Sequence, residues 1–208
     1  KSTLLKLFTR MIDTPDASLY IDGHDVNDYP LSQLRQQVSQ VLQDSFLFGE
    51  PLYSNISYDD PERNLELIWD AAESASLRGS IDDFPMKMHT IVGERGVTLS
   101  GGQKQRATLA RGLIRDAPVL ILDDCFSSVD TKTEEHILSR LKRLRAGKTT
   151  ILVSHRISTL RHSDRIVVLE AGEIVEIGSH EALLELNGAY AQLERAQTLS
   201  DESLAVQG

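Results

Sequence analysis

The chain has 208 residues, of which 40% are hydrophobic and 25% are charged, and its formal net charge at pH 7 is -9. This length is sufficient for one globular domain with a substantial core, and the acidic balance argues against a nucleic-acid partner. The single cysteine, Cys125, excludes an internal disulfide, and no apolar run approaches the about 20 residues needed to cross a bilayer.

The first half of the chain is predicted to contain one helix, two short strands and then a helical region. Apolar residues along one side predict a helix over residues 2–10. Residues 19–23 form a predicted strand that a glycine turn closes, and residues 38–42 form a second strand. From residue 44 to about residue 98 the pattern indicates short helices and loops without a clear strand, and Asn64 is the expected cap of one of these helices.

In the second half of the chain, helices and strands alternate after Gly102, which predicts a parallel sheet covered by helices. The turn at Ala171-Gly172 joins the last two strands as a hairpin. The polar stretch over residues 197–208 is expected to be a frayed tail. The predicted elements are helices over residues 102–115 and 131–144 and strands over residues 119–122, 151–154, 166–169 and 174–177.

The most informative feature is a pair of runs that lie one helix apart. The first is LSGGQ at residues 99–103, a glycine turn that opens a helix. The glycines permit a close backbone approach, and free amides at the start of a helix favour an anion. The second is the buried strand over residues 119–122, which ends in the two carboxylates Asp123 and Asp124. The occurrence of these two runs in this order, one helix apart, is a highly specific sequence signal.

Three polar side chains follow predicted parallel strands, namely Gln43, Asp123 and His155. Open α/β sheets bind ligands at the carboxyl ends of their strands. In a nucleotide site Asp123 would hold magnesium, and His155 would contact the terminal phosphate. The alternative for Asp123 is a helix cap, and the alternative for Gln43 is an exposed loop amide.

Lys1, Ser2 and Thr3 precede the first predicted helix and match the end of a phosphate-binding P-loop. There the lysine ammonium reaches the outer phosphates and the serine hydroxyl binds magnesium. Three such residues alone prove nothing, but together with the later runs they favour a P-loop. The sequence would then begin inside this loop, with the glycine part upstream.

On these residues the chain resembles the nucleotide-binding domain of ABC transporters, within them the exporter branch, over residues 1–196. The resemblance implies an α/β fold with a RecA-like P-loop NTPase core and an inserted helical signature subdomain. The core would comprise residues 1–43 and 101–196, and the helical subdomain residues 44–100. Residues 197–208 would form a flexible tail.

The resemblance also implies the motifs and the cofactors, ATP and Mg²⁺. It identifies residues 99–103 as the signature motif, residues 119–123 as the Walker B strand, residues 127–130 as the D-loop and residues 90–96 as the X-loop that faces membrane domains. Catalytic roles are implied for Asp124, His155 and Gln43. ATP contacts are implied for Lys1, Ser2, Thr3, Ser100, Gly101, Gly102, Gln103 and Asp130. Magnesium binding is implied for Ser2, Gln43 and Asp123.

Asp124 departs from the family pattern, in which the catalytic base after the Walker B aspartate is normally glutamate. Aspartate is one methylene shorter, so its carboxylate retreats by roughly 1.5 Å. Displacements of about 1 Å in a reacting geometry can cost about a hundredfold in rate. The expectation is a degenerate ATP site that mainly binds. The alternative is that Asp124 works through an extra water or a shifted backbone.

These features predict one subunit of a dimeric ABC exporter at the cytoplasmic face of the membrane, with a second ABC subunit, preferably a different one, as its head-to-tail partner. Its transmembrane domains lie outside this sequence. The transported substrate would be a drug, a lipid or a peptide. Three alternatives remain open at this stage: a homodimeric exporter with Asp124 as a working base, a soluble ABC ATPase without a transport role, and a regulatory module that only binds ATP.

Overall fold

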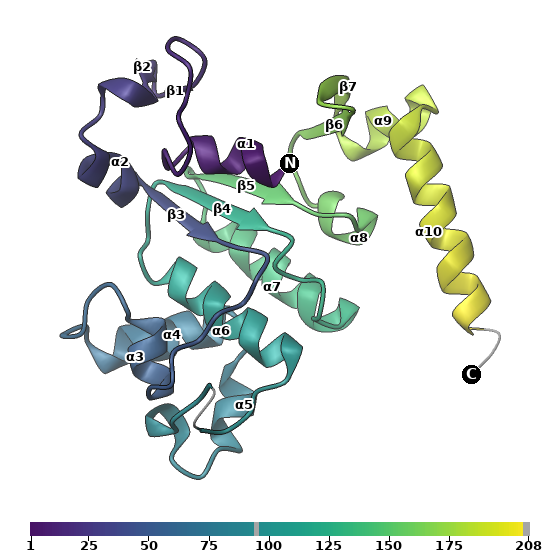
Figure 1. Cartoon of the computed structure of the whole chain (residues 1–208). Helices are drawn as coiled ribbons and strands as arrows, with labels where there is room; N and C mark the ends of the chain where they lie inside the picture. The colour runs from purple at the N-terminus through teal and green to yellow at the C-terminus, as the bar shows by residue number, and fades with distance from the viewer. Residues whose placement is uncertain (94–95, 206–208) are drawn as a thin grey trace. The chain divides into compact units, whose positions relative to one another are not determined.

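The computed structural model describes the backbone of residues 1–93 and 96–205, and the side chains of this part as far as residue 199. The chain divides into two compact units, Lys1–Val153 and Ser154–Gly208. Figure 1 shows the order of the elements along the chain. No helix in the described ranges combines the length and the apolar character that a bilayer span requires.

A three-stranded parallel sheet forms the centre of the first unit, in the order β3 (Val38–Val41), β4 (Val119–Asp123), β5 (Thr149–Val153). All five residues of β4 are buried, as expected for a central strand covered on both faces. The predicted parallel sheet is therefore confirmed. The register pairs Val41 with Leu122 and Asp123 with Val153, so the three strands end at a common edge.

Helices cover both faces of this sheet. On one face Leu120 and Leu122 share a core with α6 and α7; on the other, Val119 and Ile121 pack with Leu5 of α1. The helices of this unit are α1 (Ser2–Leu7), α2 (Leu31–Gln37), α3 (Leu52–Ile56), α4 (Leu65–Ser74), α5 (Arg78–Asp82), α6 (Gly101–Leu113) and α7 (Thr131–Leu144), with the 3-10 turns η1 (Val26–Asp28) and η2 (Lys87–His89).

Two local predictions in the first unit need comment. Helix α1 ends at Leu7, earlier than predicted, because Arg10 takes a left-handed conformation with φ 47° and its N–H closes a turn onto the carbonyl of Leu7. The predicted glycine turn is confirmed: Asp22 and Gly23 both have positive φ and connect β1 (Tyr20–Ile21) to β2 (His24–Asp25) as an antiparallel hairpin.

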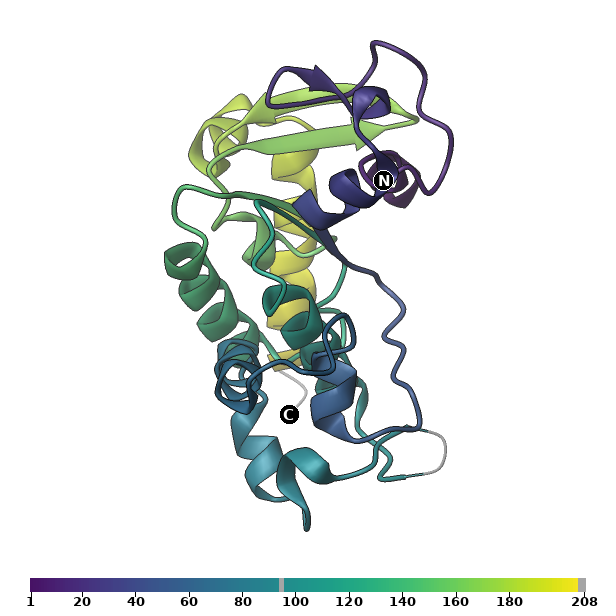
Figure 2. The same ribbon diagram turned by 90° about the vertical axis from the view of Figure 1, so that its left-hand side faces the viewer.

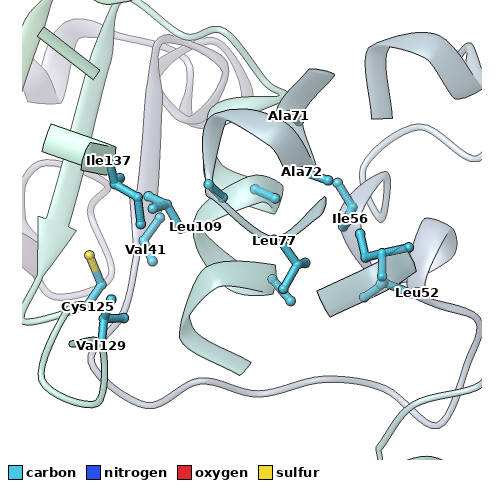
Figure 3. Packing of buried hydrophobic residues seen from close by; sticks show 14 of the residues in the cluster. Val41, Leu52, Ile56, Ala71, Ala72, Leu77, Leu109, Cys125, Val129 and Ile137 are labelled. Atoms are coloured by element: carbon cyan, nitrogen blue, oxygen red, sulfur yellow. The ribbon is translucent and has the colours of Figure 1, made fainter. Parts of the chain in front are cut away.

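The helical region after β3 shares one hydrophobic core with the sheet and α6. In Figure 3 Leu109 of α6 lies near Val41 of β3, and Leu77 lies between α6 and the helices that carry Ile56 and Ala72. The expected cap is confirmed, since Asn64 Oδ1 accepts a hydrogen bond from the N–H of Glu66 at 2.8 Å. This core explains why the helical region belongs to the same compact unit as the sheet.

The second unit is built on the predicted hairpin, β6 (Ile166–Glu170) and β7 (Glu173–Gly178), whose antiparallel strands run side by side in Figure 2. It also contains α8 (Ile157–Leu160), α9 (His180–Leu186) and α10 (Ala189–Ala205). The expected tail differs from the structure, because α10 continues through residues 197–205. The sequence from residue 189 to residue 205 contains neither glycine nor proline, so nothing local ends the helix.

Candidate nucleotide site

Asp123 and Asp124 lie at the carboxyl edge of the parallel sheet. Asp123 is the last residue of β4 and is only 4% exposed. Side chains alternate along a strand, so Asp123 is on the same face as Val119 and Ile121, the face that α1 covers. Asp124 follows with φ 47°, and its N–H donates to the carbonyl of Val153 at 2.9 Å. The two carboxylates therefore occupy a fixed turn at the end of the central strand.

Gln43 lies at the same edge, on the segment that leaves β3. The structure ends this strand at Val41, one residue earlier than predicted, and Gln43 is exposed. Val41 of β3 pairs with Leu122 of β4. Gln43 lies two residues after Val41, just as Asp124 lies two residues after Leu122. The structure thus brings Gln43 to the carboxyl edge, as the sequence predicts.

Lys1, Ser2 and Thr3 begin α1, which packs through Leu5 on the face of the sheet that also carries Asp123. Lys1 is the residue before the helix and its side chain is exposed. In Figure 1 the start of α1 lies toward the arrowheads of β4 and β5. The predicted P-loop residues and Asp123 therefore share one face of the sheet and one end of it.

The signature run forms the cap and the first turn of α6. The N–H of Gln103 donates to Ser100 Oγ at 3.2 Å, and the N–H of Ser100 donates to Gln103 Oε1 at 2.9 Å, which is a complete capping box. Of the amides that the sequence predicts to be free for an anion, those of Ser100 and Gln103 therefore already have partners inside the turn.

The two signature glycines allow α6 to approach the backbone of residues 127–130. A Cβ at Gly102 would lie 2.7 Å from the carbonyl oxygen of Ser128, and a Cβ at Gly101 would lie 3.2 Å from the side chain of Ser128. The close approach that the sequence predicts from these glycines is therefore present within one chain.

Gln105 holds the same contact and was not identified from the sequence. This buried side chain donates from Nε2 to Ser127 Oγ at 2.7 Å, and its Oε1 accepts from the N–H of Ser128 at 2.8 Å. The only sequence signal for this role is that Gln105, a polar residue, lies four positions before Leu109 and thus on the buried side of α6. The signature helix and the D-loop are consequently joined by two hydrogen bonds.

Asp130 has a structural role in addition to the expected ATP contact. Its Oδ1 caps α7 by accepting the N–H of Thr133 at 2.9 Å. The hydrogen bonds from Thr133, first from its backbone and then from its side chain, lower the pKa of Asp130, and Arg106 lowers it further. Asp130 is therefore held as an anion at the start of a fourteen-residue helix.

His155 lies in the second unit, two residues after the end of β5. It is exposed, and its carbonyl accepts a hydrogen bond from Gln197 Nε2 of α10 at 2.5 Å. Sequence reasoning found the histidine but missed Gln197, because the two residues are 42 positions apart.

Cys125 follows the acidic pair and is 1% exposed. Burial raises the pKa of its thiol, and the carboxylates of Asp124, Glu134 and Asp123 raise it further. This confirms the interpretation of Cys125 as a packed residue rather than a nucleophile.

The donor set at the sheet edge fits a magnesium ion that is bound mainly through phosphate and water. Among the described residues no cation forms an ion pair with the buried Asp123, and no group of three or more His, Cys, Asp or Glu side chains gathers. Mg²⁺ typically takes one or two protein carboxylates together with substrate phosphates and waters. One carboxylate at the sheet edge, with Ser2 and Gln43 as further candidate oxygen donors, fits that requirement.

The expected X-loop is described only in part, because Glu94 and Arg95 lie outside the described residues. Val92 is buried and its N–H donates to the carbonyl of Glu50 at 3.1 Å. At Gly93 φ is 93°, and a Cβ there would lie 2.9 Å from the carbonyl oxygen of Phe48. The described start of this loop is thus packed against the segment that follows Gln43.

Comparison with known proteins gives consistent matches. A family model described as "ABC transporter" matches residues 1–127. The ATP-dependent lipid A-core flippase of Vibrio cholerae serotype O1 is 45% identical over 198 residues, which cover 95% of this chain and 34% of the relative. A Bacillus subtilis protein named for multidrug export, YgaD, is 44% identical over 200 residues, which cover 96% of this chain and 34% of the relative.

Among solved structures, a bacterial Atm1-family ABC exporter with ATP bound superimposes with a TM-score of 0.90 at 38% sequence identity. The match covers 95% of this chain and 35% of that chain. The chain therefore spans about a third of the length of the curated relatives that it matches.

Proposed function

The chain belongs to the ABC transporter family, and on this premise we propose that it is the ATP-binding and ATP-hydrolysing domain of a dimeric exporter. The observation that supports this most strongly is the buried carboxylate of Asp123 at the end of β4, on the face of the sheet where α1 begins. The exporter would move a drug, a lipid or a peptide, and the relatives named for lipid A-core and for multidrug export support the lipid and drug classes.

The sheet edge would bind the nucleotide through its phosphates. Lys1 supplies a cation and Ser2 and Thr3 supply hydroxyls at the start of α1. Asp123, Ser2 and Gln43 are the oxygen donors for magnesium. When bound, the metal neutralises charge on the phosphates. Gln43 lies on the segment that joins β3 to the helical region. A contact between Gln43 and the bound nucleotide would therefore link the presence of the phosphates to the position of the helical region.

Asp124 is the candidate base that orients the attacking water. Its backbone is fixed by the hydrogen bond to Val153, so its carboxylate cannot advance by a simple shift of the turn. The shorter side chain then reaches less far than a glutamate would. We therefore infer a degenerate ATP site on this subunit, with His155 as the group that contacts the terminal phosphate.

The signature turn would complete the ATP site of a second ABC subunit. Its capping box holds Ser100 and Gln103 in a fixed geometry, and Gly101 and Gly102 add no side chain to the surface. The chain combines an intact signature motif with an aspartate, Asp124, in place of the longer glutamate base. This combination favours a heterodimer in which the partner subunit supplies the stronger base. The domain would lie at the cytoplasmic face of the membrane, attached to transmembrane domains.

The test is nucleotide binding to this subunit in the assembled transporter that carries this chain. Asp123→Asn should weaken magnesium-dependent binding of ATP to this subunit, measured with a photoreactive ATP analogue. Asp70→Asn, on the exposed side of α4, is the matched control and should bind like the unmodified protein. Equal labelling of both variants would refute the assignment of this sheet edge as the nucleotide site.

A further inference from the structure

Helix α10 holds the backbone that follows His155 through one side chain. Gln197 Nε2 donates to the carbonyl of His155 at 2.5 Å, and Gln197 Oε1 accepts from the N–H of Ile157 at 2.9 Å. The side-chain amide of Gln197 thus forms hydrogen bonds, through its nitrogen and its oxygen, with the two peptide groups that flank Arg156. One donor and one acceptor bind a C=O and an N–H of the same segment, as a residue of an adjacent β-strand would. Such a pair of hydrogen bonds fixes the local course of the backbone.

The segment that Gln197 contacts has no regular secondary structure of its own. Residues 154–156 connect β5 to α8, and Ser154 also holds this backbone, since its Oγ accepts from the N–H of Arg156 at 2.9 Å. Ser154 is a local contact, whereas Gln197 lies 42 positions away from His155. The conformation of this segment therefore depends on a helix that is remote in sequence.

Helix α10 is itself anchored firmly at its start. The N–H groups of Ala189 and Tyr190 donate to the carboxylate of Glu176 in β7, at 2.5 and 3.0 Å. Tyr190 is 2% exposed, and its hydroxyl lies 2.9 Å from Nδ1 of His180. Tyr190 and Gln197 are seven residues apart, so they lie on the same side of the helix, about 10 Å from each other.

We propose that Gln197 is a positioning residue that sets the direction of the His155 side chain. The inference rests on the proposed function in one respect, namely that His155 contacts the terminal phosphate. Gln197 touches neither ATP nor magnesium in this scheme. It acts by fixing the peptide groups next to the histidine, so its loss leaves the imidazole present but less well directed.

A first test measures the contact without any nucleotide. Gln197→Ala removes the acceptor of the Ile157 N–H, so amide hydrogen exchange in the peptide that contains Ile157 should accelerate by about tenfold. Gln192→Ala is the matched control, because Gln192 is an exposed residue of the same type on the same helix. Unchanged exchange in Gln197→Ala would overturn the inference.

A second test measures whether Gln197 acts through His155. In an assembled transporter whose partner subunit has lost its catalytic base, so that turnover comes from the site of this subunit, Gln197→Ala should lower kcat for ATP by about tenfold with little change in KM, since a displacement of 1 Å can cost about a hundredfold. In a His155→Ala background the same substitution should change kcat by less than about twofold, because residues that act as a unit are not additive. If the double variant lost the product of the two single fold-reductions in kcat, Gln197 would act independently of His155. That result would show a general structural defect and overturn the inference.

A third variant separates this inference from the proposed function. Gln197→Glu keeps the length of the side chain and an acceptor for Ile157 but places a carboxylate against the carbonyl of His155, so kcat should fall while the protein remains folded. If His155→Ala leaves ATPase activity unchanged in the transporter whose partner lacks its base, the proposed role of His155 is wrong. If His155→Ala lowers activity but neither Gln197 variant does, the proposed function stands and the positioning role is wrong.

Discussion

The side-chain oxygen of Gln105 accepts a hydrogen bond from the backbone N–H of Ser128 at 2.8 Å. Gln105 lies on α6, two residues after the signature run, and Ser128 lies in the D-loop that follows the Walker B strand. The signature helix is therefore joined directly to the D-loop. Within this one subunit, the part that would complete a partner's ATP site is fastened to the part that follows its own.

Replacing Gln105 by methionine, which has a similar length but no hydrogen-bonding amide, should destabilise the protein. Gln105 is 5% exposed, so the N–H of Ser128 would lose its acceptor at a site with little access to water. The expected loss in the free energy of unfolding is about 1–3 kcal/mol, measured by urea denaturation. Gln36→Met on the exposed side of α2 is the control and should change stability by less than about 0.5 kcal/mol.

The two signature glycines should differ in their tolerance of a methyl group. In Gly102→Ala the new Cβ would lie 2.7 Å from the carbonyl oxygen of Ser128, a backbone atom that cannot move aside alone. The expected cost is about 1–3 kcal/mol. In Gly101→Ala the nearest atoms, at 3.2 Å, belong to the side chain of Ser128, and the helix propensity of alanine offsets up to about 1 kcal/mol. Equal unfolding midpoints for the two variants would contradict this packing.

Asp130 should make stability depend on pH in the acidic range. Hydrogen bonds from Thr133 lower its pKa in the folded protein, so folding favours the ionised carboxylate. This contribution is complete above the unfolded pKa of about 3.9 and is lost as the pH falls through the lower folded pKa. Asp130→Asn retains a capping oxygen but no charge, so its stability deficit at pH 7 should shrink below about pH 4.

Thr133→Ala provides the matched variant for this pH dependence. It keeps the backbone N–H that Asp130 accepts and removes only the side-chain hydrogen bond. The pH dependence of the unfolding free energy should then be reduced but not abolished. A pH profile in Asp130→Asn that is parallel to that of the unmodified protein would show that this cap does not titrate on folding.

The parts of the fold that the sequence predicts are those with a local cause. The aliphatic run of β4 reflects burial on both faces, and Asn64 and the turn at Gly23 carry their own capping and turn chemistry. The carboxyl ends of parallel strands meet at one edge, so Gln43 and Asp123 could be brought together from the alternation of elements alone.

The contacts that escaped prediction join segments that are distant along the chain. Gln105 and Gln197 are ordinary helical residues in the sequence, and their roles depend on backbone groups 23 and 42 positions away. The early end of α1 has a different origin. The left-handed conformation of Arg10 accompanies a hydrogen bond from its guanidinium to the carbonyl of Tyr29, a contact that no local pattern reveals.

Asp124 provides the sharpest test of the division of labour between the two subunits. Its backbone has φ 47°, a conformation in which aspartate is several-fold enriched over most residues. The side chain is only partly buried, so a longer one can extend without displacing the core. In an assembled transporter whose partner subunit has lost its own base, Asp124→Glu should therefore advance the carboxylate by roughly 1.5 Å and raise ATP turnover by about tenfold or more.

The complementary variant, Asp124→Asn, removes the charge and keeps the shape of the side chain. If this site contributes little to turnover, Asp124→Asn should leave the ATPase rate of the heterodimer within about twofold, whereas removing the base of the partner should lower it by about a hundredfold. Both rates are measured at saturating ATP, so that they report turnover rather than binding. Loss of all activity in Asp124→Asn, together with rapid hydrolysis by a homodimer, would show instead that Asp124 is a working base in a symmetric exporter.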